Sequence, residues 1–308
     1  MARAAALSNG TASTRTLFQL QANRTWFENL AVRADGTLLA TRMDVPEVWS
    51  LDPATGVGRL LYTFPNATAL TGITEIAPDT YAVTAGDIII TTSGQPTPGT
   101  FAVWALDLQG SATPAARLIA AVPGAGFANG LTHFGPNADL VLIADAMYGL
   151  IWRLNVVSGA SSVALQDATM VRSAESPYLA VNGVRSWGEY VYYTADGTKA
   201  VYRIPVDRNA TATGPVELVA GGFSGDDFAI AADGTVYVAT NTANEVLAIS
   251  AAGDVSVLAG ASASPAVAGC TSVQLSPDGR RLFVTTNGGL IKPVAGGEVP
   301  AKVVEVVL

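Results

Sequence analysis

Polar side chains recur at one position before a repeated turn in this 308-residue chain. Seven residues before the second residue of each turn motif, or eight in the case of Asn129, stand Glu28, Gly72, Asn129, Asn182, Asp226 and Thr271. Carboxylate and amide oxygens are the ligands that hard cations prefer. If these positions converge, Glu28, Asn129, Asn182 and Asp226 form a site for Ca²⁺ or Mg²⁺. No thiol or imidazole shares the position, which argues against zinc or copper.

The alternative for any single Asn or Asp is that it caps a turn. The shared spacing favours a common site, because a slip of one residue in a strand turns the side chain to the opposite face.

Two further residues could transfer protons near this position. Asp227 directly follows Asp226, and His133, the only histidine, lies four residues beyond Asn129. An even separation in a strand places Asn129 and His133 on one face, and imidazole titrates near neutral pH. The alternative for His133 is packing between sheets. A Gly-x-Ser-x-Gly nucleophile motif is absent, and the glycine-rich segments lie in turns, so serine hydrolase chemistry and phosphate-binding loops are not expected.

Large apolar side chains accompany these polar positions. They are Trp26, Phe27, Phe127, Phe134, Met147, Tyr148, Met170, Tyr178 and Phe223. A rim of this kind suits a flat or terpenoid ligand better than a sugar lactone. For any one of them, filling space between sheets is the alternative role.

The element that must position these residues is a repeated four-stranded unit. Residues 223–250 read as a strand, an Ala-Asp-Gly turn, a β-rich strand, a loop and a third strand, and a fourth strand follows Gly253. Alternating apolar residues between Gly, Asp and Asn turns predict an antiparallel meander. The unit recurs with a period of roughly 40 to 55 residues, which is typical of β-propeller blades.

The turn recurs six times, at Ala34-Asp35-Gly36, Pro78-Asp79, Pro136-Asn137, Gly188-Glu189, Ala232-Asp233-Gly234 and Pro277-Asp278-Gly279. We therefore expect an all-β fold: one domain over residues 1–308, a six-bladed β-propeller of four-stranded antiparallel blades. Residues 16–20 should close the ring as a fourth strand beside residues 301–307, which removes two free sheet edges.

Composition excludes several classes of function. The net charge is -8 and the 17 Lys and Arg are scattered, so a nucleic-acid interface is not expected. No apolar run is long enough to span a membrane. Cys270 is the only cysteine, so no internal disulfide can form, and we expect a small buried thiol.

Glycosylation motifs begin at Asn9, Asn23, Asn66 and Asn209, which favours a secreted glycoprotein. The opening MARAAALSNG lacks the apolar core of a signal peptide, so the localisation stays open.

The pattern of Glu28, then Asn129-Gly130 and Asn182-Gly183, then Asp226 resembles the SMP-30/gluconolactonase family of six-bladed propellers. The resemblance implies that Glu28, Asn129, Asn182 and Asp226 hold a divalent cation, and that Asp226 is the general base of lactone hydrolysis. Two features differ from that family. Asp227 replaces the usual Gly, and Phe127 and Ala128 stand where an arginine often grips a polar substrate.

The apolar, acid-bearing pocket resembles the fungal members of this family that are hetero-Diels-Alderases of tropolonic sesquiterpene biosynthesis. That resemblance implies a pericyclase of fungal secondary metabolism, which joins a tropolone-derived ortho-quinone methide to a humulene-type terpene without an organic cofactor. Asn129, Asn182 or His133 would donate hydrogen bonds to the heterodiene oxygen. Glu28, Asp226 or Asp227 would move the proton in the dehydration step. The alternatives are a metal-dependent lactonase and a non-catalytic ligand-binding propeller.

Overall fold

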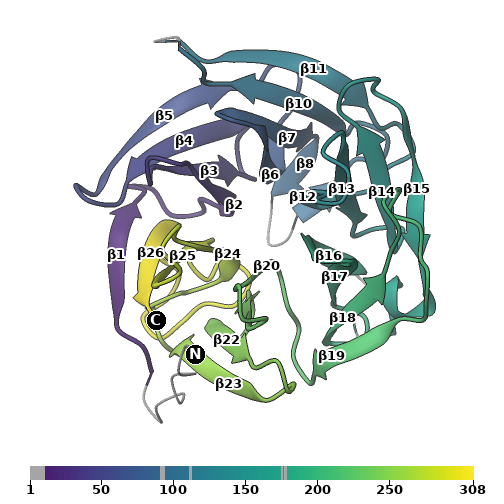
Figure 1. The fold of residues 1–308 in the computed structure, drawn as a ribbon. Helices are drawn as coiled ribbons and strands as arrows, with labels where there is room; N and C mark the ends of the chain where they lie inside the picture. The colour runs from purple at the N-terminus through teal and green to yellow at the C-terminus, as the bar shows by residue number, and fades with distance from the viewer. Residues whose placement is uncertain (1–10, 91–93, 111–112, 175, 177–178) are drawn as a thin grey trace.

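The computed structural model describes residues 11–90, 94–110, 113–174, 176 and 179–308. These residues form six four-stranded antiparallel sheets, arranged as blades around a central axis (Figure 1), and one two-stranded sheet. The predicted six-bladed propeller is therefore confirmed. All six predicted turns connect the first strand of a blade to its second.

Each blade begins with the strand nearest the axis and ends with the strand at the rim. Blades one to three comprise β2 (Phe27–Val32), β3 (Leu38–Arg42), β4 (Glu47–Asp52) and β5 (Val57–Thr63); β6 (Ala69–Ala77), β7 (Thr80–Gly86), β10 (Ala102–Asp107) and β11 (Ala115–Ala121); and β12 (Ala128–His133), β13 (Leu140–Asp145), β14 (Leu150–Asn155) and β15 (Ser161–Gln166).

Blades four to six comprise β16 (Val181–Trp187), β17 (Tyr190–Ala195), β18 (Ala200–Pro205) and β19 (Glu217–Gly221); β20 (Phe228–Ile230), β21 (Val236–Thr240), β22 (Glu245–Ile249) and β23 (Val255–Gly260); and β24 (Cys270–Leu275), β25 (Arg281–Thr286), β26 (Lys302–Val307) and β1 (Thr14–Gln19).

The chain ends close the ring as predicted. β1 pairs antiparallel with β26, so the N-terminal strand becomes the outer strand of the blade that the C-terminal residues complete. In Figure 1 the purple β1 lies beside the yellow β26. The closing strand gives blade six the same number of strands as the other five described blades.

A β-bulge near the start of the innermost strands sets the direction of the site residues. The register shifts between Phe27 and Leu30 in β2, between Ala128 and Leu131 in β12, and between Val181 and Val184 in β16. Such an extra residue bends the strand and re-aims its side chains. The bulges contain Glu28, Asn129 and Asn182, so these three residues are structurally equivalent.

The bulge corrects the predicted position in blade two. The shift there lies between Leu70 and Ile73, so Thr71 and not Gly72 is equivalent to Asn129. A second irregularity between Glu75 and Ala77 lengthens this strand by one residue. Counting residues back from the turn therefore placed the equivalent position of blade two one residue too late, at Gly72 in place of Thr71.

Short side chains let the innermost strands approach one another closely. A Cβ on Gly130 would lie 2.5 Å from the carbonyl oxygen of Asn182. Threonine hydroxyls then bridge neighbouring blades: Thr71 Oγ1 donates to the carbonyl of Ala128 at 2.8 Å, and Thr271 Oγ1 to that of Phe27 at 2.7 Å. These bonds tie the innermost strand of blade two to that of blade three, and the innermost strand of blade six to that of blade one.

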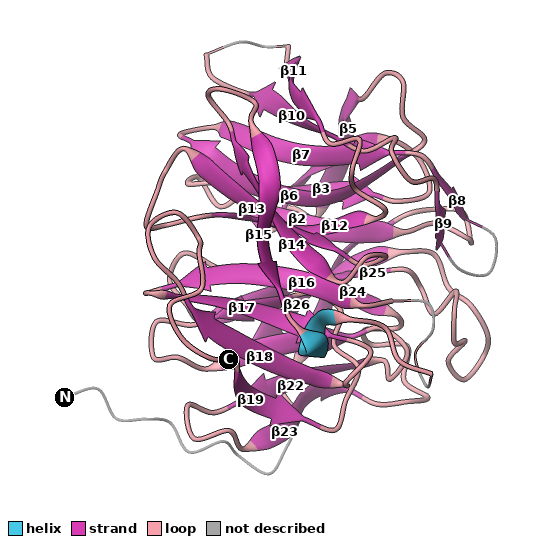
Figure 2. Ribbon diagram, turned by 90° about the vertical axis from the view of Figure 1, so that its right-hand side faces the viewer, coloured by secondary structure: helices cyan, strands magenta, loops and turns pink. Residues whose placement is uncertain are grey.

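Two short elements decorate the ring. β8 (Ile88–Ile90) and β9 (Gly94–Pro96) form a hairpin between the second and third strands of blade two, beyond the ends of the blade strands in Figure 2. η1 (Ala168–Met170) is a single 3₁₀ turn. Within the described ranges, helix is too short to cross a membrane.

Candidate functional site

The candidate site lies where the bulges of the innermost strands face the axis; we call this end of the channel the mouth. Glu28, Asn129 and Asn182 are each 4% exposed and Asp226 is 8% exposed. Asn182 Nδ2 donates to Asp226 Oδ1 at 2.8 Å, which links blades four and five directly. The structure therefore brings these two residues together, and Asn129 occupies the equivalent bulge on the neighbouring β12.

Glu28 is held by the residue two positions before it. Trp26 Nε1 donates to Glu28 Oε2 at 2.5 Å, and both side chains are buried. Because alternate residues of an extended chain point the same way, Trp26 and Glu28 face the mouth, while Phe27 points between the blades. The site thus joins an acid to an aromatic ring.

Asp226 accepts hydrogen bonds at both carboxylate oxygens. Besides the bond from Asn182, Asn241 Nδ2 donates to Asp226 Oδ2 at 2.9 Å. Asn287 Nδ2 in turn donates to Asn241 Oδ1 at 3.0 Å. Asp226 is therefore fixed from two sides by neutral donors.

Burial raises the pKa of both carboxyl groups at the mouth, Glu28 and Asp226. It raises the pKa of Glu28 from 4.5 to about 7; the bond from Trp26 opposes this rise, and the charge of Asp227 adds to it. Burial and then the negative charge of Glu28 raise the pKa of Asp226 well above its usual 3.8. The two carboxyls are thus close enough to interact, and near neutral pH the pair can retain a proton.

Asp227 belongs to a second polar layer beneath the mouth. Its Oδ2 accepts from Arg185 Nη2 at 2.8 Å and from Asn29 Nδ2 at 2.6 Å. Asn29 Oδ1 accepts from the hydroxyl of Ser272 at 3.1 Å. All four residues are at most 9% exposed. Asp227 is thereby committed to a buried ion pair with Arg185, and its role in proton transfer stays a prediction.

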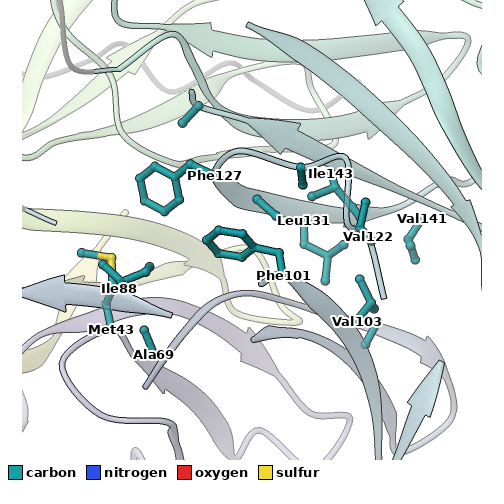
Figure 3. Packing of buried hydrophobic residues seen from close by; sticks show 14 of the residues in the cluster. Met43, Ala69, Ile88, Phe101, Val103, Val122, Phe127, Leu131, Val141 and Ile143 are labelled. Carbon is teal, nitrogen blue, oxygen red and sulfur yellow. The ribbon is translucent and has the colours of Figure 1, made fainter. Parts of the chain in front are cut away.

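An apolar core cluster of blades one to three reaches the mouth through Trp26, which donates to Glu28. Trp26, Phe101 and Phe127 belong to it, with the rings of Phe101 and Phe127 6.0 Å apart. Met43 and Ile88 lie close to these rings in Figure 3. Leu290, Met147 and Leu179 extend the same cluster. We refer to this set as the mouth cluster.

Several predicted rim residues lie elsewhere. Phe27 is fully buried and packs edge-on against Phe18 and Trp49 between blades. Phe134 and Met170 are fully buried in a separate core cluster, and Phe223 packs against a third one, with β20 and β22. They therefore pack in clusters other than the mouth cluster. Tyr178 lies outside the described residues.

Phe127 and Tyr148, in contrast, are held near the mouth by one buried acid. Asp145 is fully buried and accepts from the backbone N–H groups of Phe127 at 3.0 Å and Tyr148 at 3.0 Å. It accepts also from Gly126, Met147 and the Trp152 indole. Tyr148 itself is 47% exposed. Asp145 therefore fixes two loops of blade three.

His133 ends β12, at the opposite end of the strand from Asn129. Its ring Nε2 lies 2.8 Å from the carbonyl oxygen of Ala138 in the following turn. The side chain is partly exposed there. The predicted catalytic role required a place in the mouth, and the length of the strand separates His133 from it.

The mouth residues present a donor set that fits a hard cation. Glu28, Asn129, Asn182 and Asp226 supply two carboxylates and two amides, and the Asn182 carbonyl oxygen remains available when its nitrogen donates to Asp226. Within the described ranges, no cluster of three or more His, Cys, Asp or Glu suited to a metal is present. A cation here would therefore depend on the two amide oxygens.

Surface cavities occur away from the mouth. One of about 260 Å³ lies at the far ends of the innermost strands and is lined by Ala31, Val32, Ile73, Thr74, Glu75, Gln274, Leu275 and Pro277. A second, of about 480 Å³, is lined mainly by polar residues of blade one, among them Arg33, Asp35 and Arg59. The first cavity is the natural competitor of the mouth as a ligand site.

Four polar residues near the mouth were missed by the sequence analysis. Asn241 and Asn287 follow the second strands of blades five and six, after Thr240 and Thr286. This shared place, an Asn directly after a Thr that ends a strand, was the available signal. Arg185 and Asp145 showed no such pattern, because their partners lie on other strands or loops.

Sequence comparison finds two relatives, and no family model matches the chain. The first is named "Putative hetero-Diels-Alderase asR5" of Sarocladium schorii, 27% identical over 211 residues, which is 60% of this chain and 52% of the relative. The second is named "Putative hetero-Diels-Alderase" of a Phoma species, 27% identical over 221 residues, 63% of this chain and 62% of the relative. The matches thus span about half to three fifths of these relatives' lengths.

Solved structures share the fold. A calcium-binding regucalcin from Agrobacterium tumefaciens superposes with a TM-score of 0.65 at 17% identity, over 96% of this chain and 95% of the other. A gluconolactonase from Xanthomonas campestris gives a TM-score of 0.65 at 13% identity, over 96% and 90%. The chain is therefore similar in sequence to proteins named as hetero-Diels-Alderases and similar in fold to the regucalcin and gluconolactonase propellers, as the resemblance in the sequence predicted.

Proposed function

We propose that this protein is an enzyme that catalyses a hetero-Diels–Alder reaction between a tropolone-derived ortho-quinone methide and a humulene-type alkene. The observation that carries the proposal is the junction of two buried, hydrogen-bonded acids with an apolar wall, where Trp26 belongs to both. The two relatives named as hetero-Diels-Alderases support the same reaction class.

The first step would be loss of water from a hydroxymethyl tropolone. A proton moves to the hydroxymethyl oxygen, the C–O bond breaks, and the tropolone hydroxyl gives a proton to a carboxylate. The step thus needs one acid and one base. Glu28 and Asp226 form such a pair, because burial raises the pKa of both and their charges interact.

The second step would form one C–C and one C–O bond with the alkene, without losing atoms. Its main requirement is that two apolar molecules are held in one orientation, which can contribute on the order of 7 to 11 kcal/mol. The mouth cluster would supply this contact surface, and its exclusion of water would spare the quinone methide from hydration. Amide N–H groups of Asn129 or Asn182 would polarise the heterodiene oxygen.

A divalent-metal-dependent lactonase is the second candidate, favoured by one observation: the donor set at the mouth fits Ca²⁺ or Mg²⁺. In that case Glu28, Asn129, Asn182 and Asp226 would hold the ion, which would polarise the lactone carbonyl. Asp226 would activate water. The apolar wall and the lack of an arginine beside Asn129 favour the cycloaddition over this alternative.

The test is a panel assay. The purified protein is incubated with a hydroxymethyl tropolone plus humulenol, and separately with generic lactones, each with and without EDTA. We expect a single adduct stereoisomer that EDTA does not abolish. Lactone turnover that EDTA removes, with no adduct above the uncatalysed level, would overturn the proposal. Asn182→Ala should lower the adduct yield or its stereoselectivity, and an unchanged product profile would exclude the mouth.

A further inference from the structure

Two asparagines of blades five and six connect a loop of the mouth to Asp226. Asn287 is fully buried, and its Oδ1 accepts from the backbone N–H of Gly289 at 3.0 Å and of Leu290 at 3.2 Å. Its Nδ2 donates to Asn241 Oδ1 at 3.0 Å. Asn241 Nδ2 donates to Asp226 Oδ2 at 2.9 Å. The four groups form one continuous chain.

The backbone fixes the direction of this chain. An N–H group can only donate, so the two backbone donors require the oxygen of the Asn287 amide to face them. The nitrogen of Asn287 must then face Asn241, and the oxygen of Asn241 must accept. The nitrogen of Asn241 is left for Asp226. The usual ambiguity in the orientation of a side-chain amide is therefore removed at both residues.

Local sequence serves this arrangement. A Cβ on Gly269, whose φ is +61°, would lie 1.8 Å from Asn287 Oδ1. Gly269 also accepts the Asn287 backbone N–H at its carbonyl, at 2.8 Å. Leu290, which the Asn287 oxygen anchors, belongs to the mouth cluster. The same amide thus positions one apolar residue of the mouth and, through Asn241, one acid.

We propose that Asn287 and Asn241 form a directional amide relay that positions Asp226, and that Asn241 presents its second N–H to an oxygen of the substrate. Asn241 is only partly buried, whereas Asn287 is closed off. An amide nitrogen carries two donors and Asp226 takes one. The inference rests on the proposed function for the identity of that oxygen, the carbonyl of the heterodiene. Asn287 is then a positioning residue.

The test uses variants that separate the relay from folding. Asn287→Asp still accepts from Gly289 and Leu290 but cannot donate to Asn241. Asn241→Ala removes the donor to Asp226. The matched control is Asn244→Asp: Asn244 is equally buried, its Oδ1 accepts from Gly269 at 2.6 Å and its Nδ2 donates to Ser262, and it does not contact Asp226.

In the adduct assay with a hydroxymethyl tropolone and humulenol, we expect Asn241→Ala and Asn287→Asp each to lower kcat about 10- to 100-fold, the loss expected for one hydrogen bond to a charged group. KM should change little, because the mouth cluster holds the substrates. Asn244→Asp should keep its kcat. The double variant should be no slower than Asn241→Ala alone, since both changes break one chain. A double variant whose loss of kcat equals the product of the two single losses would overturn the relay. A kcat for Asn287→Asp equal to that of the control would overturn it as well.

A second readout does not need turnover. In ¹H–¹⁵N spectra, the side-chain amide signals of Asn241 should shift in Asn287→Asp and in Asp226→Asn, and should stay in place in Asn244→Asp. If the side-chain amide signals of Asn241 do not shift in Asn287→Asp, the relay is wrong, independently of the activity of the enzyme. If they shift as expected while the wild-type protein forms no adduct, the relay stands and the proposed function fails.

Discussion

Replacing Glu28 by glutamine should change the way in which stability depends on pH. Glu28 is 4% exposed, and burial raises its pKa from 4.5 to about 7. Between these two values the folded protein binds a proton that the unfolded chain releases, so the free energy of unfolding falls as pH rises. At roughly 1.4 kcal/mol for each pH unit, the total loss is about 3 kcal/mol.

Glutamine keeps the shape of Glu28 and does not ionise. The assay is urea denaturation of the wild type and of Glu28→Gln at pH 4.5 and at pH 8.5, in the presence of EDTA. At pH 4.5 Glu28 is neutral in the folded wild type. The difference in stability between the two proteins at this pH therefore measures the effects of the substitution other than charge. Between the two pH values, the variant should gain about 3 kcal/mol relative to the wild type.

A difference in the free energy of unfolding between the two proteins that is the same at both pH values would show that the pKa of Glu28 is not raised. The opposite result would be a wild type that becomes more stable, relative to Glu28→Gln, as pH rises. It would contradict the raised pKa as well. That second outcome means that the folded state favours the carboxylate, as it does when a cation is bound. Repeating the titration with millimolar Ca²⁺ separates these cases, because a ligand of the folded state alone raises stability by mass action.

Three further changes test the buried contacts of the mouth loops, the inner strands and blade six. Asp145→Asn should lower the free energy of unfolding by about 3 kcal/mol in urea denaturation. The Asp145 carboxylate accepts from five N–H groups, and the amide of Asn would place an NH₂ group against some of these donors. An unaltered midpoint would show that these bonds do not hold the loops. Gly130→Ala should destabilise by about 2 kcal/mol, since its Cβ would meet the Asn182 carbonyl, whereas Gly135→Ala, with its nearest neighbour at 3.9 Å, should not; equal melting temperatures would contradict the close packing of the inner strands. Burial lowers the pKa of Lys302, so the wild type should gain stability relative to Lys302→Met as pH rises from 7 towards 10; a constant difference in calorimetry would contradict that burial.

The blade pattern was readable from the sequence because it rests on local signals. Turn residues such as Asp35-Gly36 and alternating apolar strands recur in each blade, and they specify the meander without long-range information. The pairing of β1 with β26 followed from counting strands: the sixth repeat lacked one and the N-terminus had one to spare. The choice of Glu28, Asn129, Asn182 and Asp226 followed from counting residues back from the turn of each blade.

The remaining features depend on contacts that a local pattern does not encode. The second irregularity of β6 moved the equivalent position from Gly72 to Thr71. The ion pair of Asp227 with Arg185 joins residues 42 positions apart on two blades, so the sequence pattern did not predict it. Phe27 and Trp26 are adjacent aromatic residues, so composition does not distinguish them. Alternation along the strand places Phe27 between blades and Trp26 at the mouth.

The most direct measurement is a crystal structure of the protein soaked with tropolone. We expect the tropolone ring to lie against Trp26 and Phe127, with its oxygens within hydrogen-bond distance of Asp226 and of the Asn182 or Asn241 amide. Tropolone bound instead in the cavity beside Thr74 and Gln274, with the mouth unchanged, would contradict the claim that these acids and this apolar wall form one site.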